Sequence, residues 1–291
     1  MSDDRWAIIV HGGAKDIPPS LEQVHRDGCL LALAVGQAIL EAGGSALDAV
    51  EMAVRSLEDD PIFNAGYGAV LNARGEVELD AAIMDGATLD VGGVAAVKTL
   101  RHPISVAASM LPEKPVLLVG DGAECFAREH DAEFCDPMDL VVERPGDPGC
   151  DTVGCVALDR HGNVAAGTST GGLTGCHPGR VGDAPLPGCG LYADNAVGGV
   201  SLSGDGESLI RTTLAAHLIH SLEAMPPAPA IAAALTCLGR VGGEAGLIVI
   251  DADGQIDWGH NSAQFAVAHA SAGRPAQAFV NRAQDAQKDS P

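Results

Sequence analysis

The spacing of apolar and polar residues divides the chain into a helical part, a strand-rich middle and a second helical part. Apolar residues recur at helical spacing over 21–40, and Gly43-Gly44 follows as a typical helix C-terminus. Ser45 is a suitable N-cap for a second helix that reaches about Glu58. Shorter helices are expected over 104–110 and 123–128, and longer ones over 207–224 and 229–240.

Strands are expected where apolar and β-branched residues run between turn signals. The first, residues 6–10, is expected to stop at Gly12-Gly13, and a hairpin is expected to join 70–71 to 77–84. The remaining predicted strands are 94–97, 116–119, 152–158, 164–168, 246–250 and 256–258, the last two joined by a turn at Asp253-Gly254. Helices and strands that come in blocks favour an α+β fold, with helices on the outer faces of strand-rich sheets, over a doubly wound parallel sheet.

Two stretches have the composition of irregular structure. Residues 130–151 are rich in Asp, Glu, Pro and Gly and are predicted to form a flexible linker. Residues 171–190 are dense in Gly and Pro and are expected to form a loop. Between them, residues 152–168 read as strand, turn and strand. This predicted hairpin therefore begins directly after a linker.

The composition excludes several classes of partner. The 291 residues carry a formal net charge of −22, which disfavours binding to nucleic acid and to anionic membranes. Because the sequence shows neither a secretory signal nor an apolar run of about 18 residues, a cytoplasmic protein without a membrane span is expected. The eight cysteines are dispersed without a C-x-x-C pair, which indicates reduced thiols rather than disulfides or a zinc site.

Three patterns suggest other chemistries and fail on their context. Gly-x-Gly patches at 66–68, 120–122 and 204–206 never complete a dinucleotide-binding or P-loop sequence. Residues 251–254 resemble part of a calcium loop but lack its third ligand position and its final Glu, so a hairpin turn is favoured. Residues 167–171 match Gly-x-Ser-x-Gly around Ser169, but the Gly and Pro residues that follow leave no helix to complete a nucleophile elbow.

Thr152 is the residue whose position points most directly to chemistry. A threonine hydroxyl is a poor nucleophile without a base. If the bond between Asp151 and Thr152 is cut, the new α-amine lies beside the Thr152 hydroxyl. With a pKa of about 7.7–8.0, this amine can take the hydroxyl proton near neutral pH. Taken alone, Thr152 is better explained as a β-branched residue that starts a strand. The residues that follow it decide between the two interpretations.

The stretch after Thr152 contains further groups suited to that chemistry. Thr168-Ser-Thr170 supplies hydroxyls on the predicted partner strand. Arg180 and Asp183 lie three residues apart in a loop and suit a zwitterion, since guanidinium binds an α-carboxylate and carboxylate binds an α-ammonium. Ser203-Gly-Asp-Gly206 offers a hydroxyl and exposed backbone N–H groups for an oxyanion. Together these features favour catalysis by Thr152.

With these residues the chain resembles the plant-type asparaginase and isoaspartyl peptidase family of N-terminal-nucleophile hydrolases, which also includes the aspartylglucosaminidases. The resemblance covers nearly the whole chain outside the linker and the C-terminal tail. The segments that carry it are 11–14 (His-Gly-Gly-Ala), 45–68, 79–86, 151–154 (Asp-Thr-Val-Gly) and 168–206.

The resemblance implies a four-layer αββα sandwich that is synthesised as a precursor. Autocleavage would give an α subunit of residues 1–151 and a β subunit of residues 152–291, which together form one domain. Catalysis would need no cofactor. By the same resemblance, Thr152 would be the nucleophile, supported by Thr170 and Asn64, and Ser203 and Gly204 would form the oxyanion hole. Arg180 would bind the substrate's α-carboxylate and Asp183 its α-amine. Gly204 and Gly206 would also line the substrate site.

Two further properties are implied by the resemblance alone. The αβ units would assemble as a dimer of heterodimers. A structural sodium would be bound through backbone oxygens in the loop 57–67, namely those of Leu57, Glu58, Asp60, Phe63, Ala65 and Tyr67.

The chain departs from the family pattern at two places. Ser203 stands where Thr is usual and keeps the hydroxyl. Gly175-Cys-His177 replaces an Asn-Lys pair, which alters the expected mouth of the site.

The sequence therefore predicts a hydrolase that cleaves β-aspartyl amide bonds in isoaspartyl dipeptides and L-asparagine and releases L-aspartate. Three alternatives remain at this point. An aspartylglucosaminidase would release N-acetylglucosamine from its asparagine conjugate. An uncleaved chain would only bind aspartate-like ligands. A serine esterase would use Ser169 and would not need Thr152.

Overall fold

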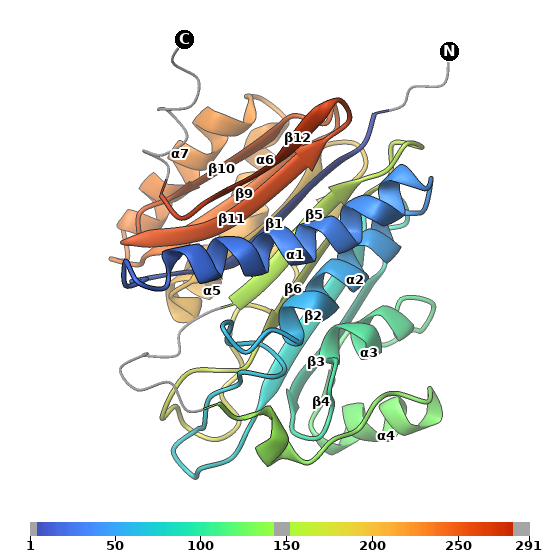
Figure 1. The fold of residues 1–291 in the computed structure, drawn as a ribbon, viewed down its shortest axis with the longest axis vertical. Helices are drawn as coiled ribbons and strands as arrows, with labels where there is room; N and C mark the ends of the chain where they lie inside the picture. The colour runs from blue at the N-terminus through green and yellow to red at the C-terminus, as the bar shows by residue number, and fades with distance from the viewer. Residues whose placement is uncertain (1–4, 143–151, 282–291) are drawn as a thin grey trace.

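The computed structural model describes residues 5–142 and 152–281 and contains two β-sheets. The larger sheet has eight strands in the order β12-β11-β1-β5-β6-β2-β3-β4, and the smaller has four in the order β10-β9-β8-β7. Within both sheets neighbouring strands are antiparallel, except that β3 and β4 are parallel. Figure 1 shows α1 and α2 lying across the outer face of the larger sheet, over β1, β5 and β6.

The bounds of the elements are as follows. The strands are β1 (Ala7–Lys15), β2 (Leu79–Asp85), β3 (Val91–Val97), β4 (Leu118–Val119), β5 (Thr152–Leu158), β6 (Val164–Thr170), β7 (Leu191–Asp194), β8 (Gly198–Gly204), β9 (Ala245–Asp251), β10 (Ile256–His260), β11 (Gln264–Ser271) and β12 (Arg274–Phe279). The helices are α1 (Glu22–Glu41), α2 (Ala46–Glu58), α3 (Pro103–Ser109), α4 (Asp121–Glu129), α5 (Gly206–Thr212), α6 (Leu214–Leu222) and α7 (Pro227–Gly239), with a 3₁₀ turn η1 (Pro137–Leu140).

Three apolar clusters hold these elements together. One lies between the larger sheet and helices α1, α2 and α3, and it includes Leu33 and Val50. A second lies between the two sheets and includes Val156 and Trp258. The third lies between the smaller sheet and helices α6 and α7, and it includes Leu218. Burial of aliphatic surface on both faces of each sheet is the main favourable contribution to folding in this aromatic-poor chain.

Strand alternation directs the candidate residues into the space between the sheets. Val156 on β5 and Val164 on β6 belong to the cluster between the sheets, and every second residue of a strand shares a face. Thr152 and Thr170 therefore face the smaller sheet, and they are paired directly opposite each other at the open end of the β5–β6 hairpin. Ser203 lies near the end of β8 on the facing sheet.

Several predicted elements are confirmed. The helices α1 and α2 occupy the predicted stretches, and the Ser45 side chain caps α2 by accepting the N–H of Asp48 at 3.0 Å. The predicted hairpin of β5 and β6 forms. The hairpin of β9 and β10 also forms, and in its turn Asp251 accepts the N–H groups of Asp253 and Gln255. These elements have strong local signals, namely a cap or a turn residue between apolar runs.

Two predictions about strands are wrong. Gly12-Gly13 does not end β1, because the strand continues to Lys15 through an irregularity between His11 and Ala14, with Gly13 at φ +103°. Residues 70–71 do not form a strand, and β2 pairs with β3 and β6 instead. The partner strands thus override the local signals.

The helix predicted over 207–224 is interrupted. Thr213 adopts a left-handed conformation with φ +45° between α5 and α6. A tertiary hydrogen bond accompanies the break, since the N–H of Ala216 donates to the carbonyl of Gly188 at 2.9 Å instead of to the preceding turn. Four strands, β7, β8, β11 and β12, were not among the predicted elements.

The predicted linker is structured over its first part. Residues 137–140 form η1, whose N-cap Asp136 accepts the N–H of Met138 at 2.9 Å. The side chain of Leu140 is buried, and its carbonyl accepts the N–H groups of Gly68 and Ala69. These contacts fix the segment against the body, so the linker prediction does not hold for residues 130–142. The rest of the predicted linker, 143–151, lies outside the described residues, and the predicted cleavage residue Asp151 is among them.

Candidate active site

Thr152 lies where the two sheets meet, and only 7% of its surface is exposed. Its backbone N–H donates to Ser203 Oγ at 3.3 Å. The same hydroxyl accepts the N–H of Ala14 at 3.1 Å. Ser203 comes from the smaller sheet, whereas Ala14 comes from β1, the strand beside β5. The Ser203 hydroxyl therefore lies at the nitrogen that would become an α-amine if the chain were cut before Thr152.

Thr170 and Asn64 border the same place. Thr170 Oγ1 accepts the N–H of Gly172 at 3.3 Å. Asn64 holds this segment from the other side, since its Nδ2 donates to the Gly172 carbonyl at 2.7 Å and its own carbonyl accepts the N–H of Gly171 at 2.8 Å. Asn64 thus fixes the chain immediately after Thr170, which lies opposite Thr152.

Arg180 is held by Glu207 in a two-pronged ion pair. Nε lies 2.7 Å from Oε1 and Nη2 lies 2.8 Å from Oε2. Nη1 is not used in this ion pair and can bind a ligand. It lies beside Gly182, because a Cβ built on that glycine would be only 3.2 Å from Nη1. Glu207 follows Gly206, which starts α5. The geometry fixes the plane of the guanidinium while keeping one edge of it available for a carboxylate.

Asp183 lies beside the guanidinium and is 3% exposed. A Cβ on Gly206 would lie 2.9 Å from Arg180 Nη2 and 2.9 Å from Asp183 Oδ1, so only glycine fits between the two groups. Burial raises the pKa of the Asp183 carboxyl to about 7, with the charges of Asp80 and Glu207 adding to the rise and that of Arg180 opposing it. Within the described part of the chain, Asp183 Oδ2 has no hydrogen-bond partner. A buried carboxylate oxygen without a partner is a suitable acceptor for a ligand's ammonium group.

These groups line one small cavity of about 30 Å³. It brings together the predicted nucleophile, its neighbour on β6, the arginine and aspartate of the loop, and one of the two predicted oxyanion-hole residues. The lining residues are Thr152, Thr170, Gly172, Leu173, Arg180, Gly182, Asp183 and Gly204. Ser203, Asn64 and Gly206 lie immediately behind this lining, through the contacts given above.

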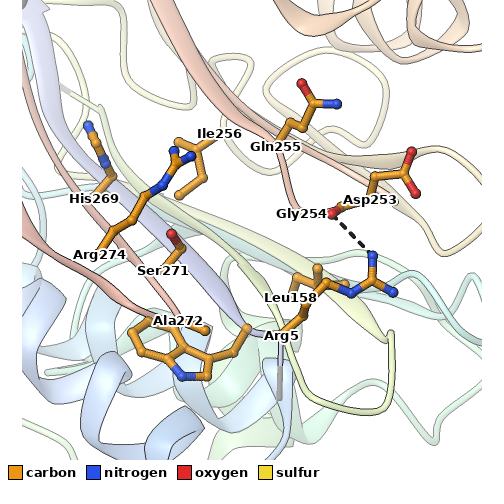
Figure 2. Close-up of a pocket in the computed structure, with 11 residues that line it drawn as sticks. Arg5, Leu158, Asp253, Gly254, Gln255, Ile256, His269, Ser271, Ala272 and Arg274 are labelled. Atoms are coloured by element: carbon orange, nitrogen blue, oxygen red, sulfur yellow. Dashed lines mark hydrogen bonds between the residues drawn. The ribbon is translucent and has the colours of Figure 1, made fainter. Parts of the chain in front are cut away.

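A larger pocket lies elsewhere and contains none of the predicted residues. It has a volume of about 460 Å³, and Figure 2 shows Arg5, His269 and Arg274 among its side chains, with Arg5 donating to the carbonyl of Asp253. Leu158, at the opposite end of β5 from Thr152, also lines it. A seven-residue strand spans about 20 Å, so this pocket is remote from Thr152. The predicted catalytic and binding residues therefore converge on the smaller cavity and not on this pocket.

Ser169 is directed away from the cavity. It alternates with Thr168 and Thr170 along β6 and so faces the helices rather than the smaller sheet. Its hydroxyl donates to Glu58 Oε1 at 2.7 Å, and both side chains are buried. Burial is the main cause of the raised pKa of Glu58, and the His102 ring opposes it. This position contradicts the serine-esterase alternative, because a buried hydroxyl outside the cavity cannot reach a substrate there.

The loop predicted to hold sodium closes on itself. The N–H of Tyr67 donates to the carbonyl of Glu58 at 2.7 Å, which brings the two ends of the loop together. Gly66 has φ +51°, and a Cβ there would lie 2.7 Å from the same carbonyl. Leu57, Phe63 and Ala65 of the predicted ligand set are fully buried. Asp59 and Pro61 are exposed, so the loop is closed but only partly buried. Its backbone carbonyl groups are ligands of the type that a hard cation prefers, since each carbonyl has a second lone pair.

Three polar residues near the cavity carried no predicted role. Glu207 holds Arg180, and Asp80 lies opposite Thr170 on β2. His11 Nε2 lies 2.8 Å from Ser201 Oγ, and burial lowers the pKa of the His11 ring to about 3, with the backbone of Thr152 opposing this shift. All three lie inside or next to segments that carry the family resemblance. Their positions depend on strand pairing, and residue type alone could not reveal them.

Among the described residues, no group of three or more His, Cys, Asp or Glu side chains is placed to bind a metal ion. The helices of the same residues include none that is long and apolar enough to cross a membrane. The first of these findings concerns side chains only, and carbonyl ligands such as those of the loop 57–67 are a separate matter.

The sequence matches a family model described as asparaginase, over residues 4–145 and 139–280. Among curated proteins, an isoaspartyl peptidase/L-asparaginase from Xenopus laevis is 43% identical over 270 residues, which cover 86% of this chain and 87% of that protein. A protein of the same name from Rattus norvegicus is 42% identical and covers 88% of this chain and 83% of its own length. One from Danio rerio is 40% identical and covers 92% and 93%.

Proposed function

Because the chain belongs to the asparaginase family, we propose that it is an isoaspartyl peptidase and L-asparaginase that uses Thr152 as an N-terminal nucleophile. The observation that carries the proposal is the convergence of Thr152, Arg180 and Asp183 on one cavity. The relatives' names favour this function over that of an aspartylglucosaminidase. The substrates are small β-aspartyl amides, either L-asparagine or an isoaspartyl dipeptide.

Cleavage between Asp151 and Thr152 creates the catalytic base. The new α-amine takes the proton of the Thr152 hydroxyl, and the oxygen attacks the β-carbonyl carbon of the substrate. The amine then returns the proton to the leaving nitrogen, so that ammonia or an amino acid departs and a β-aspartyl ester remains on Thr152. Water, deprotonated by the same amine, hydrolyses the ester and releases L-aspartate. No cofactor enters these steps.

The substrate's aspartyl part is read by the Arg180–Asp183 pair. Arg180 binds the α-carboxylate through the edge of the guanidinium that Glu207 leaves available, and Asp183 binds the α-ammonium. Both groups line the cavity with Thr152, so the zwitterion fixes the β-carbonyl at the nucleophile. The backbone of Gly204 and the Ser203 hydroxyl stabilise the oxyanion, and Thr170 and Asn64 keep the nucleophile in place.

The remaining features of the proposal concern the whole molecule. The two sheets, with helices on the outer face of each, form an αββα sandwich. Residues 1–151 and 152–291 become the α and β subunits of one domain, and two such units form a dimer in the cytoplasm. The loop 57–67 holds a structural sodium through its carbonyl groups, which stabilises the position of Asn64 and supplies no step of the reaction.

The proposal is tested by sequencing the N-termini of the purified protein. A second terminus that reads Thr-Val-Gly-Cys establishes cleavage before Thr152. The same preparation should release L-aspartate from L-asparagine or from an isoaspartyl dipeptide. A preparation with one terminus only would refute the proposed mechanism. A cleaved preparation that releases no L-aspartate from these compounds, but releases N-acetylglucosamine from its asparagine conjugate, would refute the proposed substrate.

Replacement of Ser203 by alanine is expected to lower kcat by about 10²- to 10³-fold. The reason is that its hydroxyl lies at the Thr152 nitrogen and is proposed to stabilise the oxyanion. Ser203→Thr keeps the hydroxyl and serves as the matched control, with activity near that of the parent protein. Steady-state kinetics on fully cleaved samples checks this, and equal activity of the alanine and threonine variants would remove Ser203 from the mechanism.

A further inference from the structure

The loop that carries Arg180 and Asp183 is held at two points by carboxylates, one directly before β2 and one within it. Glu78 accepts the N–H of Gly179 on both oxygens, at 3.0 and 2.9 Å. Asp80 Oδ2 accepts the N–H of Gly182 at 3.4 Å. The two fixed amides flank Arg180 on either side in the sequence. The loop has glycine at both fixed positions, and φ is +81° at Gly179.

Asp80 connects this loop to the strand that faces the nucleophile. It lies opposite Thr170 on β6, which in turn lies opposite Thr152 on β5. The three residues therefore lie side by side across β2, β6 and β5, with their side chains on the same face of the sheet. Adjacent strands are about 4.8 Å apart, so Asp80 is about 10 Å from Thr152 across the sheet. It does not line the cavity, whereas Gly182, which it holds, does.

The other carboxylate oxygen of Asp80 is held by an irregularity in β3. Leu79 pairs with Val97 but Ala81 pairs with Val94, so β3 contains an extra residue opposite Asp80. Ala96 at this bulge has φ +52°, and its N–H donates to Asp80 Oδ1 at 2.8 Å. A left-handed alanine costs free energy and persists where the surroundings compensate for it. Here it turns an N–H group toward Asp80, as β-bulges near active sites commonly redirect a group.

We infer that Asp80 is a positioning residue for substrate recognition: it fixes the Gly182 amide so that Arg180 and Asp183 are aimed together at the aspartyl group held beside Thr152. Glu78 performs the same task at Gly179 with a more accessible side chain. The inference rests on the proposed function, since it assumes that Arg180 and Asp183 bind the substrate. Asp80 is 2% exposed and is not among the residues that line the cavity.

The test compares Asp80→Asn with Asp159→Asn. An asparagine at 80 offers an NH₂ group to one of two backbone N–H donors and so loses one of the two anchors. Asp159 is a matched control, because it is also 2% exposed and its carboxylate also accepts backbone N–H groups, those of Ala46, His161 and Asn163. It lies in the β5–β6 turn, at the end of that hairpin opposite to Thr152. Loss of stability alone should affect both variants alike.

The readout is the discrimination between L-aspartate and β-alanine, which lacks the α-carboxylate. It is measured as the inhibition constant of β-alanine divided by that of L-aspartate. Asp80→Asn should raise KM for L-asparagine by at least about tenfold, with a smaller change in kcat, and should reduce this ratio by a similar factor. Asp159→Asn should leave the ratio unchanged. If Asp80→Asn does not accumulate as cleaved, folded protein, Glu78→Gln is measured against the same control, with the same direction expected.

The outcomes separate the two proposals. An unchanged ratio in Asp80→Asn, or in Glu78→Gln where that variant takes its place, would overturn the positioning role, and so would an equal fall in Asp159→Asn. A parent protein that does not discriminate between L-aspartate and β-alanine would instead overturn the proposed binding mode of Arg180 and Asp183, and with it the basis of the inference.

Discussion

Replacement of Thr152 by alanine is expected to leave a single full-length chain and to abolish release of L-aspartate. Cleavage and hydrolysis both need the Thr152 oxygen as nucleophile, first on the preceding carbonyl and then on the substrate. Among the described residues that line the cavity, Thr170 carries the other hydroxyl, and it has no free α-amine to act as its base. The loss of activity should therefore be complete within detection. Denaturing gel electrophoresis and an aspartate assay on the same sample check both parts.

Thr152→Ser is the matched control for this experiment. It keeps a hydroxyl on the same buried strand end and should still be cut, at a lower rate, and still release aspartate. Thr170→Val provides the second comparison, because it removes the opposite hydroxyl while keeping a β-branched side chain. Two bands from Thr152→Ala would show that another group cleaves the chain, and aspartate release by that variant would remove Thr152 from catalysis.

The sequence is most informative where a local signal and a short-range pairing agree. The hairpin of β5 and β6 follows from two apolar runs around a polar turn, and its register alone places Thr170 opposite Thr152. The Ser45 cap was likewise visible in the sequence, because the hydroxyl and the backbone it caps are three residues apart. These parts of the fold and site could be predicted because few residues decide them.

The rest of the site depends on contacts between distant segments. Ser203 reaches Thr152 only because β8 packs face to face with β5. The residues of β8 alone do not predict this packing. Asp80 meets the Gly182 amide across a hundred residues. Left-handed residues such as Ala96 and Thr213 are not glycine, so residue type gave no warning of the bulge and of the break between α5 and α6.

Gly12-Gly13 shows the opposite error. Glycine is a frequent strand breaker, but β1 pairs with β11 on one side beyond this point, and the pairing resumes at Ala14 after the irregularity. The extension matters for the site, because Ala14 donates its N–H to the Ser203 hydroxyl. If β1 ended before Gly12, Ala14 would not be placed to donate its N–H to the Ser203 hydroxyl.

Asp183→Asn is expected to stabilise the protein at high pH while greatly reducing its activity. The folded-state pKa of Asp183 is raised from 3.8 to about 7, so the native state favours the protonated form. Below pH 4 the carboxyl is protonated in both states and has no such effect. As pH rises from about 4 to 7 the unfolded state gains stability by ionising, and the native state loses up to about 4 kcal/mol relative to it. Asparagine removes this loss.

The stability measurement is best made in the uncleaved Thr152→Ala background, where one chain unfolds. The difference in midpoint between Asp183→Asn and its parent should be small near pH 4, grow up to pH 7 and then level off. Saturating L-aspartate should stabilise the parent at pH 8, since its ammonium pairs with the Asp183 carboxylate, and should have little effect on the variant. A difference in midpoint that does not depend on pH would contradict the assignment of the buried charge.

The activity of Asp183→Asn provides the second half of this prediction. In the cleaved enzyme, kcat/KM of the parent should fall as pH decreases through about 7, because the substrate's ammonium must displace a proton from Asp183. The Thr152 amine, with a pKa of about 7.7–8.0, adds a second loss in the same direction. Asp183→Asn should lower kcat/KM by about 10²-fold or more and should keep only the dependence due to the amine. Ionised Asp183 destabilises the empty enzyme, but the substrate's ammonium group needs this charge in the complex. Such a carboxylate is expected at a site selected to bind an ammonium group, since the ligand supplies the opposite charge that the protein alone does not.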